Sequence, residues 1–340
     1  MSIKKGLLIS LALFILCLVA VIIFLLQPSG QVKNFEKWQY QASEKTAPPS
    51  TLSVKFFGVS TLLFDDGKSQ LLIDGFFTRP SLTKVLFEKI HSQPELIKQV
   101  IQHHQLQRTQ AIFVTHSHYD HALDIPILAE LLPKAKIVGS ASTLNIARGN
   151  PHVSKQQLIQ IEAWKPMTFA HFRVTAIPSQ HTPPTAVNND LGEEITAPLH
   201  LPARFSEFKE GGSFDYLIEH QGYKILVKAS TGTVPEQLKN LKVDTLFLGI
   251  AQLSRQSEAF QQNYLDQTLR TLQPKVVVPI HWDNFFKAAD QPLEFLPYLA
   301  DNSEKSLNIL IQAAKQQNAS VVLLSQAVSY PLTQALHSKP

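Results

Sequence analysis

The stretch of sequence that decides the fold is Thr115-His116-Ser117-His118-Tyr119-Asp120-His121. It follows an apolar run over residues 111–115, which has the length and composition of a buried strand. Alternate side chains of extended backbone point the same way, so His116 and His118 can share one metal ion. Asp120 and His121 can then turn toward a second ion. Such a pattern has a chance expectation on the order of one in a thousand over the chain, which disfavours solvated loop histidines.

The composition indicates that any bound metal is held by imidazole and carboxylate. The chain has 340 residues, of which 13 are histidine and one, Cys17, is cysteine. A single cysteine excludes a disulfide framework and a cysteine-based zinc module. Hydrophobic residues make up 44% and charged residues 17%, as in globular chains. The net charge is only +4 and the longest basic run is Lys4-Lys5, so nucleic acid is not an expected partner.

An apolar run near the N-terminus predicts a transmembrane helix. Leu7–Leu26 would span about 30 Å as a helix, the thickness of a bilayer core. The following Leu26-Gln27-Pro28 lacks the small residues of a cleavage site, so residues 1–26 are expected to remain as a membrane anchor. A removed signal peptide is the alternative.

The charges around this run predict its orientation. Lys4 and Lys5 precede it, which places the N-terminus in the cytoplasm and the rest of the chain outside, periplasmic or external. Lys33 and Lys37 follow it and weaken the asymmetry. Residues 27–50 are polar and contain Pro48-Pro49, which predicts a tether between the anchor and a single domain over residues 51–330.

Within that domain, short β-rich runs alternate with longer helical patterns. This mixture predicts an α+β fold whose sheets are covered by helices. Asp65-Asp66-Gly67 is typical of a hairpin turn between two strands. Strands are expected at 53–57, 61–64, 70–73, 111–115, 136–138, 172–177, 216–219, 224–227, 245–248 and 275–280. Helices are expected at 81–107, with an interruption at Pro94, and at 123–132, 257–272 and 304–317.

The histidine motif resembles the metallo-β-lactamase superfamily, and the resemblance extends over most of residues 52–325. It implies an αββα sandwich with a metal site where loops follow strand ends. Two further segments match, Ser179-Gln180-His181-Thr182 and Pro279-Ile280-His281-Trp282, each after a predicted strand. The second form looks like the branch that contains ascorbate-phosphate lactonase and the N-acyl-phosphatidylethanolamine phospholipase D enzymes.

The resemblance implies two divalent ions, with three protein ligands each. Zinc is the favoured metal, and manganese or iron would also suit these ligands. Asp120 is also the expected catalytic residue, which orients the nucleophile and accepts its proton. The ligands of the first ion would be His116, His118 and His181, and those of the second Asp120, His121 and His281.

One position departs from the family pattern. The family usually has Gly-Asp-Thr-Gly, with an Asp that bridges the metals, where this chain has Ala229-Ser230-Thr231-Gly232. Ser230 brings no charge and is a poor zinc ligand. Three ligands and a water still make a normal catalytic shell, so we expect a weaker second metal. A non-catalytic, degenerate homologue is the alternative.

The predicted function is that of a metal-dependent hydrolase that uses a metal-bound hydroxide. The anchor favours an amphiphilic or lipid-like ester or phosphodiester, the lactonase resemblance favours small lactones, and a β-lactam is a third option. The alternative is a membrane-tethered metal-binding or interaction module. The proline-rich segment 183–212 could close over substrate, and Phe285 and Phe286 could join an apolar rim. The sequence does not predict the oligomeric state. The predicted substrate contacts are Phe76, Phe77, His200 and Trp282.

Overall fold

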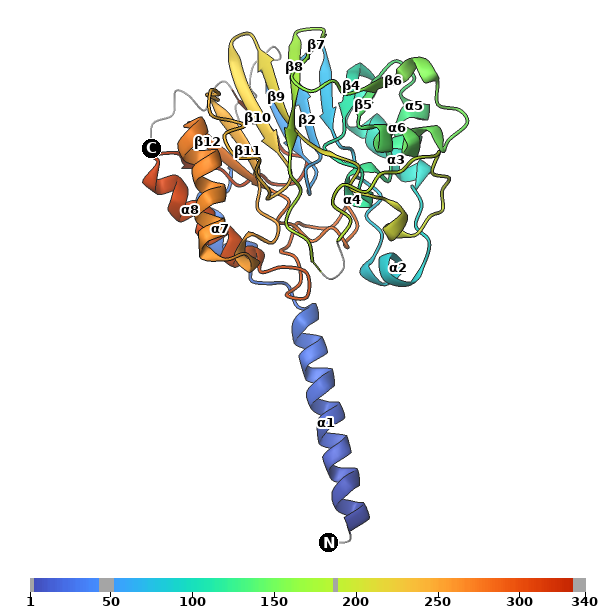
Figure 1. The fold of residues 1–340 in the computed structure, drawn as a ribbon, viewed down its shortest axis with the longest axis vertical. Coiled ribbons are helices and arrows are strands. Elements are labelled where there is room, and N and C mark those ends of the chain that lie inside the picture. Colours follow the sequence, from blue (N-terminus) through green and yellow to red (C-terminus); the bar gives the residue numbers. More distant parts are fainter. Residues whose placement is uncertain (1–2, 43–51, 186–188, 333–340) are drawn as a thin grey trace.

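Two seven-stranded sheets face each other at the centre of the molecule (Figure 1). The computed structural model describes residues 3–42, 52–185 and 189–332. The first sheet has the order β14-β1-β2-β3-β4-β5-β6, and the second has the order β13-β12-β11-β10-β9-β8-β7. The strands of the first sheet are β1 (Ser53–Phe56), β2 (Leu62–Asp65), β3 (Gln70–Ile73), β4 (Thr109–Phe113), β5 (Lys136–Gly139), β6 (Leu158–Gln160) and β14 (Ser329–Pro331). Those of the second are β7 (Pro166–Phe169), β8 (Phe172–Ser179), β9 (Ser213–His220), β10 (Tyr223–Lys228), β11 (Thr245–Gly249), β12 (Val276–Ile280) and β13 (Ser320–Val321).

Helices cover the outer face of each sheet, which confirms the predicted αββα sandwich (Figure 1). On the first sheet lie α2 (Leu82–Phe87), α3 (Pro94–His103), α5 (Ile125–Leu131) and α6 (Ala141–Arg148). On the second lie α7 (Glu258–Leu265) and α8 (Ser303–Gln316). The short helix α4 (Tyr119–Ala122) follows the histidine motif, and 3-10 turns occur at Val32–Trp38, Leu106–Arg108, Lys155–Gln157, Phe205–Glu207 and Leu253–Arg255.

Strand periodicity explains how the first sheet holds two hydrophobic cores. On β3, Leu71 and Ile73 belong to the central core between the sheets, whereas Leu72 belongs to a second core under the helices of the first sheet. All four residues of β3 are buried. Alternate side chains of a strand point to opposite faces, so a sheet covered on both sides is apolar throughout.

The structure confirms one predicted helix interruption and one predicted turn. The helical pattern over 81–107 forms two helices, α2 and α3, and Pro94, which lacks an amide N–H, stands in the first turn of α3. The expected hairpin turn joins β2 to β3, with Gly67 at φ +83°. Predicted helix 257–272 begins as α7 and continues as a π-helix over Asp266–Arg270.

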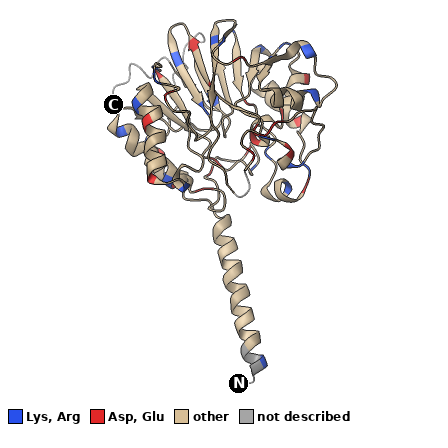
Figure 2. Ribbon diagram, viewed as in Figure 1, with Lys and Arg blue, Asp and Glu red and all other residues tan. Residues whose placement is uncertain are grey.

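The N-terminal helix α1 (Ile3–Leu26) projects from the globular part (Figure 1). Its stretch Leu7–Leu26 has no buried residue and is long and apolar enough to cross a membrane, a test that signal sequences also pass. The charged residues lie on the globular part and at the start of α1, and the rest of the helix carries none (Figure 2).

Within the predicted tether, residues 27–50, several of the described residues pack on the domain. Ser29 and Phe35 are 0% and 2% exposed, and the ring of Phe35 lies 5.7 Å from that of Phe295. The end of α1 is held as well, because the amide of Leu299 donates to the carbonyl of Leu25. Burial of the Phe35 ring favours this packing. The average composition of the segment is polar and gave no sign of it.

Candidate metal centre

The ends of three strands bring the predicted metal ligands to one edge of the sandwich. Residues 115–121 follow β4, His181 lies two positions after the end of β8, and His281 follows β12 directly. Loops at the carboxyl ends of strands face the same edge, which is where binding sites form in folds of this kind. The structure thus brings together side chains that stand up to 165 positions apart (116 to 281).

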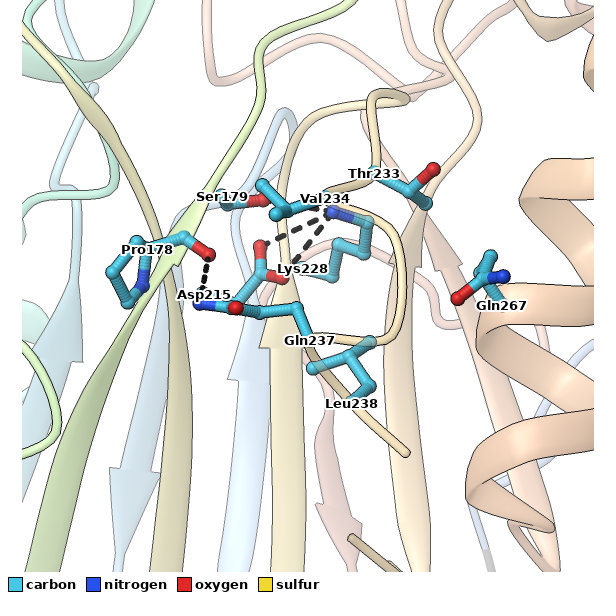
Figure 3. A pocket seen from close by; sticks show the side chains of 9 residues that line it. All are labelled: Pro178, Ser179, Asp215, Lys228, Thr233, Val234, Gln237, Leu238 and Gln267. Atoms are coloured by element: carbon cyan, nitrogen blue, oxygen red, sulfur yellow. Dashed lines mark hydrogen bonds and ion pairs between the residues drawn. The ribbon is translucent and has the colours of Figure 1, made fainter. Parts of the chain in front are cut away.

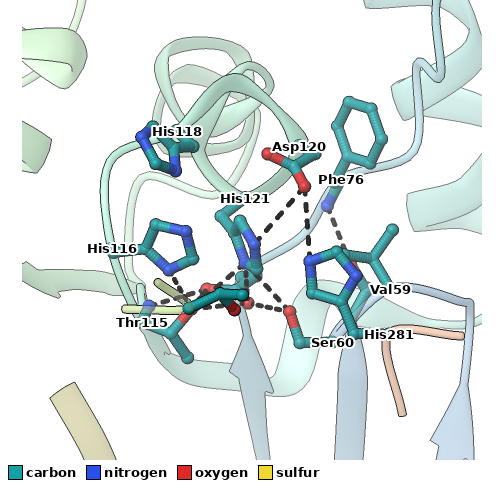
Figure 4. A network of polar contacts seen from close by, with 12 residues as sticks. Val59, Ser60, Phe76, Thr115, His116, His118, Asp120, His121 and His281 are labelled. Atoms are coloured by element: carbon teal, nitrogen blue, oxygen red, sulfur yellow. Dashed lines mark hydrogen bonds and ion pairs between the residues drawn. The ribbon is translucent and has the colours of Figure 1, made fainter. Parts of the chain in front are cut away.

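The six predicted ligands form two groups of three. We name them the His116 group (His116, His118, His181) and the Asp120 group (Asp120, His121, His281). Within each group the potential ligand atoms lie within 4.8 Å of one another. The rings of His116 and His121 are 3.9 Å apart, so the groups adjoin (Figure 4). Asp120 Oδ2 lies 3.6 Å from His121 Nε2 and 3.4 Å from His281 Nε2. Tetrahedral ligands about 2.0–2.1 Å from an ion are about 3.3 Å apart, so the spacing fits one ion.

Unpartnered nitrogens show that the residues fit metal ions. His116 Nε2 and His121 Nε2 are buried and have no hydrogen-bond partner. A buried polar atom without a partner costs about 1–3 kcal/mol, which a coordinated ion would offset. All six residues are at most 9% exposed.

Hydrogen bonds behind the histidines select which nitrogen faces the centre. Asp74 Oδ2 lies 2.8 Å from His121 Nδ1, and neither side chain is exposed. Accepting from that nitrogen leaves the Nε2 lone pair directed at the Asp120 group. The carbonyl of Thr182 lies 3.0 Å from His181 Nδ1, which leaves His181 Nε2 directed at the His116 group. Such outer partners fix the tautomer and orientation of metal-binding imidazoles.

His118 has the opposite arrangement. Its Nε2 lies 3.1 Å from both carboxylate oxygens of Asp190, so Nδ1 is the nitrogen directed at the His116 group. Asp190 belongs to the proline-rich segment 183–212, whose described part also packs on the histidine loop through a bond from the Ser117 amide to the Glu210 carbonyl. The segment predicted as a cover therefore also positions a candidate ligand.

The protonation states also suit cations. Burial, followed by the charges of the neighbouring histidines, lowers the pKa of His116 well below its usual value, and burial lowers the pKa of His181 to about 3. Burial raises the pKa of Asp120, but the adjacent His121 and His281 outweigh it and hold that pKa well below its usual value. At neutral pH His116 and His181 are therefore neutral imidazoles and Asp120 is an ionised carboxylate. Burial lowers the pKa of His281, but the adjacent Asp120 outweighs it and raises that pKa.

A strained backbone segment supports His281. Its amide donates to the carbonyl of Val59, and the Val59 amide donates to Asp283 Oδ1 at 2.7 Å. Val59 and His281 both have left-handed φ angles, +52° and +57°, which cost free energy in a β-branched or imidazole-bearing residue. Gly58 precedes them at φ +95°, and a Cβ there would lie 1.6 Å from an Arg79 nitrogen.

The comparison with protein families decides the assignment. A model of the beta-lactamase superfamily domain matches residues 70–282. The chain belongs to the metallo-β-lactamase superfamily. A search of curated proteins found no match. The predicted branch, with the lactonase and the phospholipase D enzymes, stays a prediction.

Solved structures share the superfamily fold at low sequence identity. The metallo-β-lactamase fold protein YhfI from Bacillus subtilis is 12% identical, with a TM-score of 0.52 over 83% of this chain and 99% of that chain. A possible metal-dependent hydrolase from Veillonella parvula is 13% identical, with a TM-score of 0.50 over 83% and 99%. CmlA, a diiron β-hydroxylase from Streptomyces venezuelae, is 12% identical, with a TM-score of 0.51 over 84% of this chain and 55% of that chain. These similarities establish the fold.

Ser230, where the superfamily usually has a bridging Asp, lies in a buried loop after β10. The loop contacts the His181 segment, since the Thr231 amide donates to Thr182 Oγ1 at 3.2 Å. A Cβ on Gly232 would lie 2.2 Å from the His181 carbonyl oxygen, so the backbones touch there. The Ser230 side chain supplies no charge to either ligand group.

Three of the four predicted substrate contacts are wrong in this structure. Phe76, Phe77 and Trp282 are 0%, 1% and 1% exposed and cannot touch a bound molecule. Their rings pack in the cores instead, Phe76 against Tyr119 and Trp282 against Phe295. Sequence alone does not tell an aromatic residue in a site loop from one that anchors the loop to the core.

Other aromatic residues surround the centre where substrate would approach. Phe285, which the sequence placed in the rim, lies 5.7 Å from the His281 ring and 6.4 Å from that of Tyr119, and Phe205 also adjoins Tyr119 at 6.4 Å. We name Tyr119, Phe205 and Phe285 the aromatic rim; all three are partly exposed. His200 is exposed and its Nδ1 lies 2.9 Å from the Gly149 carbonyl.

A buried ion pair beside β8 was missed by the sequence analysis. Lys228 Nζ donates to Ser179 Oγ at 2.8 Å and lies 3.2 Å from Asp215 Oδ2 (Figure 3). Both charged side chains are almost fully buried, 1% and 4% exposed. The ion pair lines a pocket together with Ser179, Gln237 and Gln267, and Ser179 stands two positions before His181 in the chain. It ties β8, β9 and β10 together where β8 delivers that histidine.

Proposed function

We propose that this protein is a metal-dependent hydrolase with two metal ions at the His116 and Asp120 groups. The observation that carries the proposal is the convergence of five imidazoles and one carboxylate, in which the buried Nε2 atoms of His116 and His121 lack any hydrogen-bond partner. Divalent metal ions supply Lewis acidity and lower the pKa of water to about 7.

The protein's own residues hold and orient this chemistry. His116, His118 and His181 would hold one ion; Asp120, His121 and His281 would hold the other. Asp74 keeps the His121 ring in place, and Asp120 Oδ2, between two imidazoles, is the atom that would accept a proton from the attacking water. Ser230 leaves the second ion with fewer negative charges around it, so we propose that this ion binds more weakly.

We further propose an amphiphilic ester or phosphodiester as substrate, presented at a membrane surface. In Figure 1 the strand ends near α4 lie at the same end of the domain from which α1 leaves. The aromatic rim offers apolar contacts there. Helix α2, at that end too, exposes Leu86 by 42% and Phe87 by 76%, next to Lys84 and Lys89. Apolar side chains flanked by lysines are typical of interfacial contact with lipid headgroups.

The proposed location of the domain follows from the N-terminal helix α1. With α1 uncleaved and Lys4 in the cytoplasm, the domain would lie outside, periplasmic or external, with its active edge toward the bilayer. The second candidate function is a membrane-tethered, non-catalytic metal-binding module, which the missing bridging Asp favours.

A substrate panel tests the proposal. The full chain, supplied with zinc, manganese or iron, would be assayed on bis-p-nitrophenyl phosphate, on short- and long-chain acyl lactones and on a chromogenic cephalosporin. We expect metal-dependent turnover that disappears in His116→Ala/His118→Ala, together with the ion of the His116 group. The exposed His152→Ala is the matched control and should retain both. Stoichiometric metal without turnover on any substrate would select the non-catalytic module, and unchanged turnover in the double variant would refute the mechanism.

A further inference from the structure

A third group of potential metal ligands lies at the other end of the sandwich. Asp66 lies in the β2–β3 turn, His171 in the β7–β8 turn and His220 at the end of β9. Their potential ligand atoms lie within 4.8 Å of one another. We name these three residues the Asp66 cluster. His171 directly precedes β8, whereas His181 follows its end, so the eight-residue strand separates the two sites by about 26 Å.

The carboxylate of Asp66 is held so that one oxygen faces both imidazoles. Its Oδ1 accepts from the amides of Lys68 and Ser69 at 2.9 and 2.7 Å. Its Oδ2 lies 2.8 Å from His171 Nδ1 and 3.2 Å from His220 Nε2. Burial raises the pKa of Asp66, but the Ser69 amide and the other bonds hold it well below its usual value, so the carboxylate is ionised.

We infer that the Asp66 cluster binds a divalent cation of the zinc type. Two imidazole nitrogens and a carboxylate oxygen are a ligand set that zinc accepts, and the two O···N distances, 2.8 and 3.2 Å, lie within about 0.5 Å of the about 3.3 Å between tetrahedral ligands. Asp66 and His220 are 5% and 4% exposed, whereas the His171 side chain is 46% exposed. The open side at His171 gives the ion a way in and a position for water.

The position of the cluster points to a structural role. Asp66 belongs to the first sheet, and His171 and His220 belong to the second. Asp66 is 105 positions from His171 and 154 from His220 along the chain. An ion here would join the two sheets at the edge away from α1 (Figure 1). Clips that close long loops restrict the unfolded chain most, and metal binding that requires the folded site adds to folding stability.

Zinc counting and thermal unfolding test this inference. The full chain in detergent would be stripped with a chelator, titrated with zinc alone and dialysed, and bound zinc would be counted by atomic emission. We expect His171→Ala to bind one zinc fewer per chain than the wild type and His152→Ala to bind the same number. The half-exposed His171 can be truncated without opening a cavity, so the variant should fold.

The metal-centre variant separates this site from the proposed active site. In the His116→Ala/His118→Ala background, zinc should still raise Tm, and adding His171→Ala should abolish most of that increase. His220→Gln, which keeps a polar group at the buried position, should act as His171→Ala does. Equal zinc content in wild type and His171→Ala, or an equal rise in Tm with and without His171, would overturn the inference whatever the hydrolase assay shows.

Discussion

Replacing Asp74 by Asn should weaken metal binding although it changes none of the candidate ligands. Asp74 is fully buried and uses both oxygens: Oδ1 accepts from the Thr115 amide at 2.7 Å, and Oδ2 faces His121 Nδ1 at 2.8 Å. Ser60 Oγ also donates to Oδ2, at 2.5 Å. An asparagine has one acceptor oxygen, so it can serve Thr115 or His121 but not both.

The magnitude follows from the bond that is lost. A hydrogen bond to a charged group contributes about 1.5–3 kcal/mol to stability. Loss of a carboxylate behind a metal-binding histidine typically reduces metal affinity 10- to 100-fold, about 1.4–2.7 kcal/mol. We therefore expect Asp74→Asn to raise the zinc Kd of the Asp120 group by this factor, because the His121 ring is no longer held with Nε2 toward the ion.

Competition with a chromophoric chelator would measure this affinity, and chemical denaturation would measure the loss of stability. Asp301→Asn is the matched control, since Asp301 is also fully buried and accepts from the Gln252 amide at 2.8 Å but touches no candidate ligand. The control should lose stability and keep its zinc affinity. Wild-type zinc affinity in Asp74→Asn, or an equal loss in Asp301→Asn, would refute this reasoning.

Four further predictions follow from the same geometry. Ser230→Asp should tighten the second metal, seen as two ions per chain at metal concentrations where the wild type binds fewer. Phe87→Asp should lower turnover of vesicle-bound substrate several-fold and leave a soluble substrate unaffected; equal effects on both would count against interfacial contact. Arg79→Met should destabilise the fold by about 3–5 kcal/mol in denaturant titrations, because Asp283, 3.1 Å away and 0% exposed, is left unpaired. Burial, then Lys55 and His103, lowers the pKa of His104 from 6.5 to about 4. The unfolded chain then binds the extra proton, so stability falls as pH drops from 6.5 toward 4, and His104→Phe should reduce that fall in Tm.

Much of the fold could be predicted because its signals are local. Short apolar runs such as the one within Gln70–Ile73 and the turn at Asp65-Asp66-Gly67 depend on neighbours within a few residues. The packing of segment 28–40 on the domain was not predicted, because a few aromatic rings, of which Phe35 is buried and Tyr40 packs on Tyr330, barely change its polar composition.

The sequence by itself determined the order of the ligand segments and the residue types that could serve a metal. A strand end followed by histidine is visible in one dimension, and the sheet then carries His116, His181 and His281 to a common edge. Only the tertiary structure decided what stands behind and around them. Asp74 and Asp190 act on histidines 47 and 72 positions away, and the Asp66 cluster joins three turns from two sheets. Pairings over such distances depend on how the sheets pack, and no local pattern records them. The same packing buried Phe76, Phe77 and Trp282 and left Phe285 at the rim, since exposure is a property of the assembled core rather than of residue type.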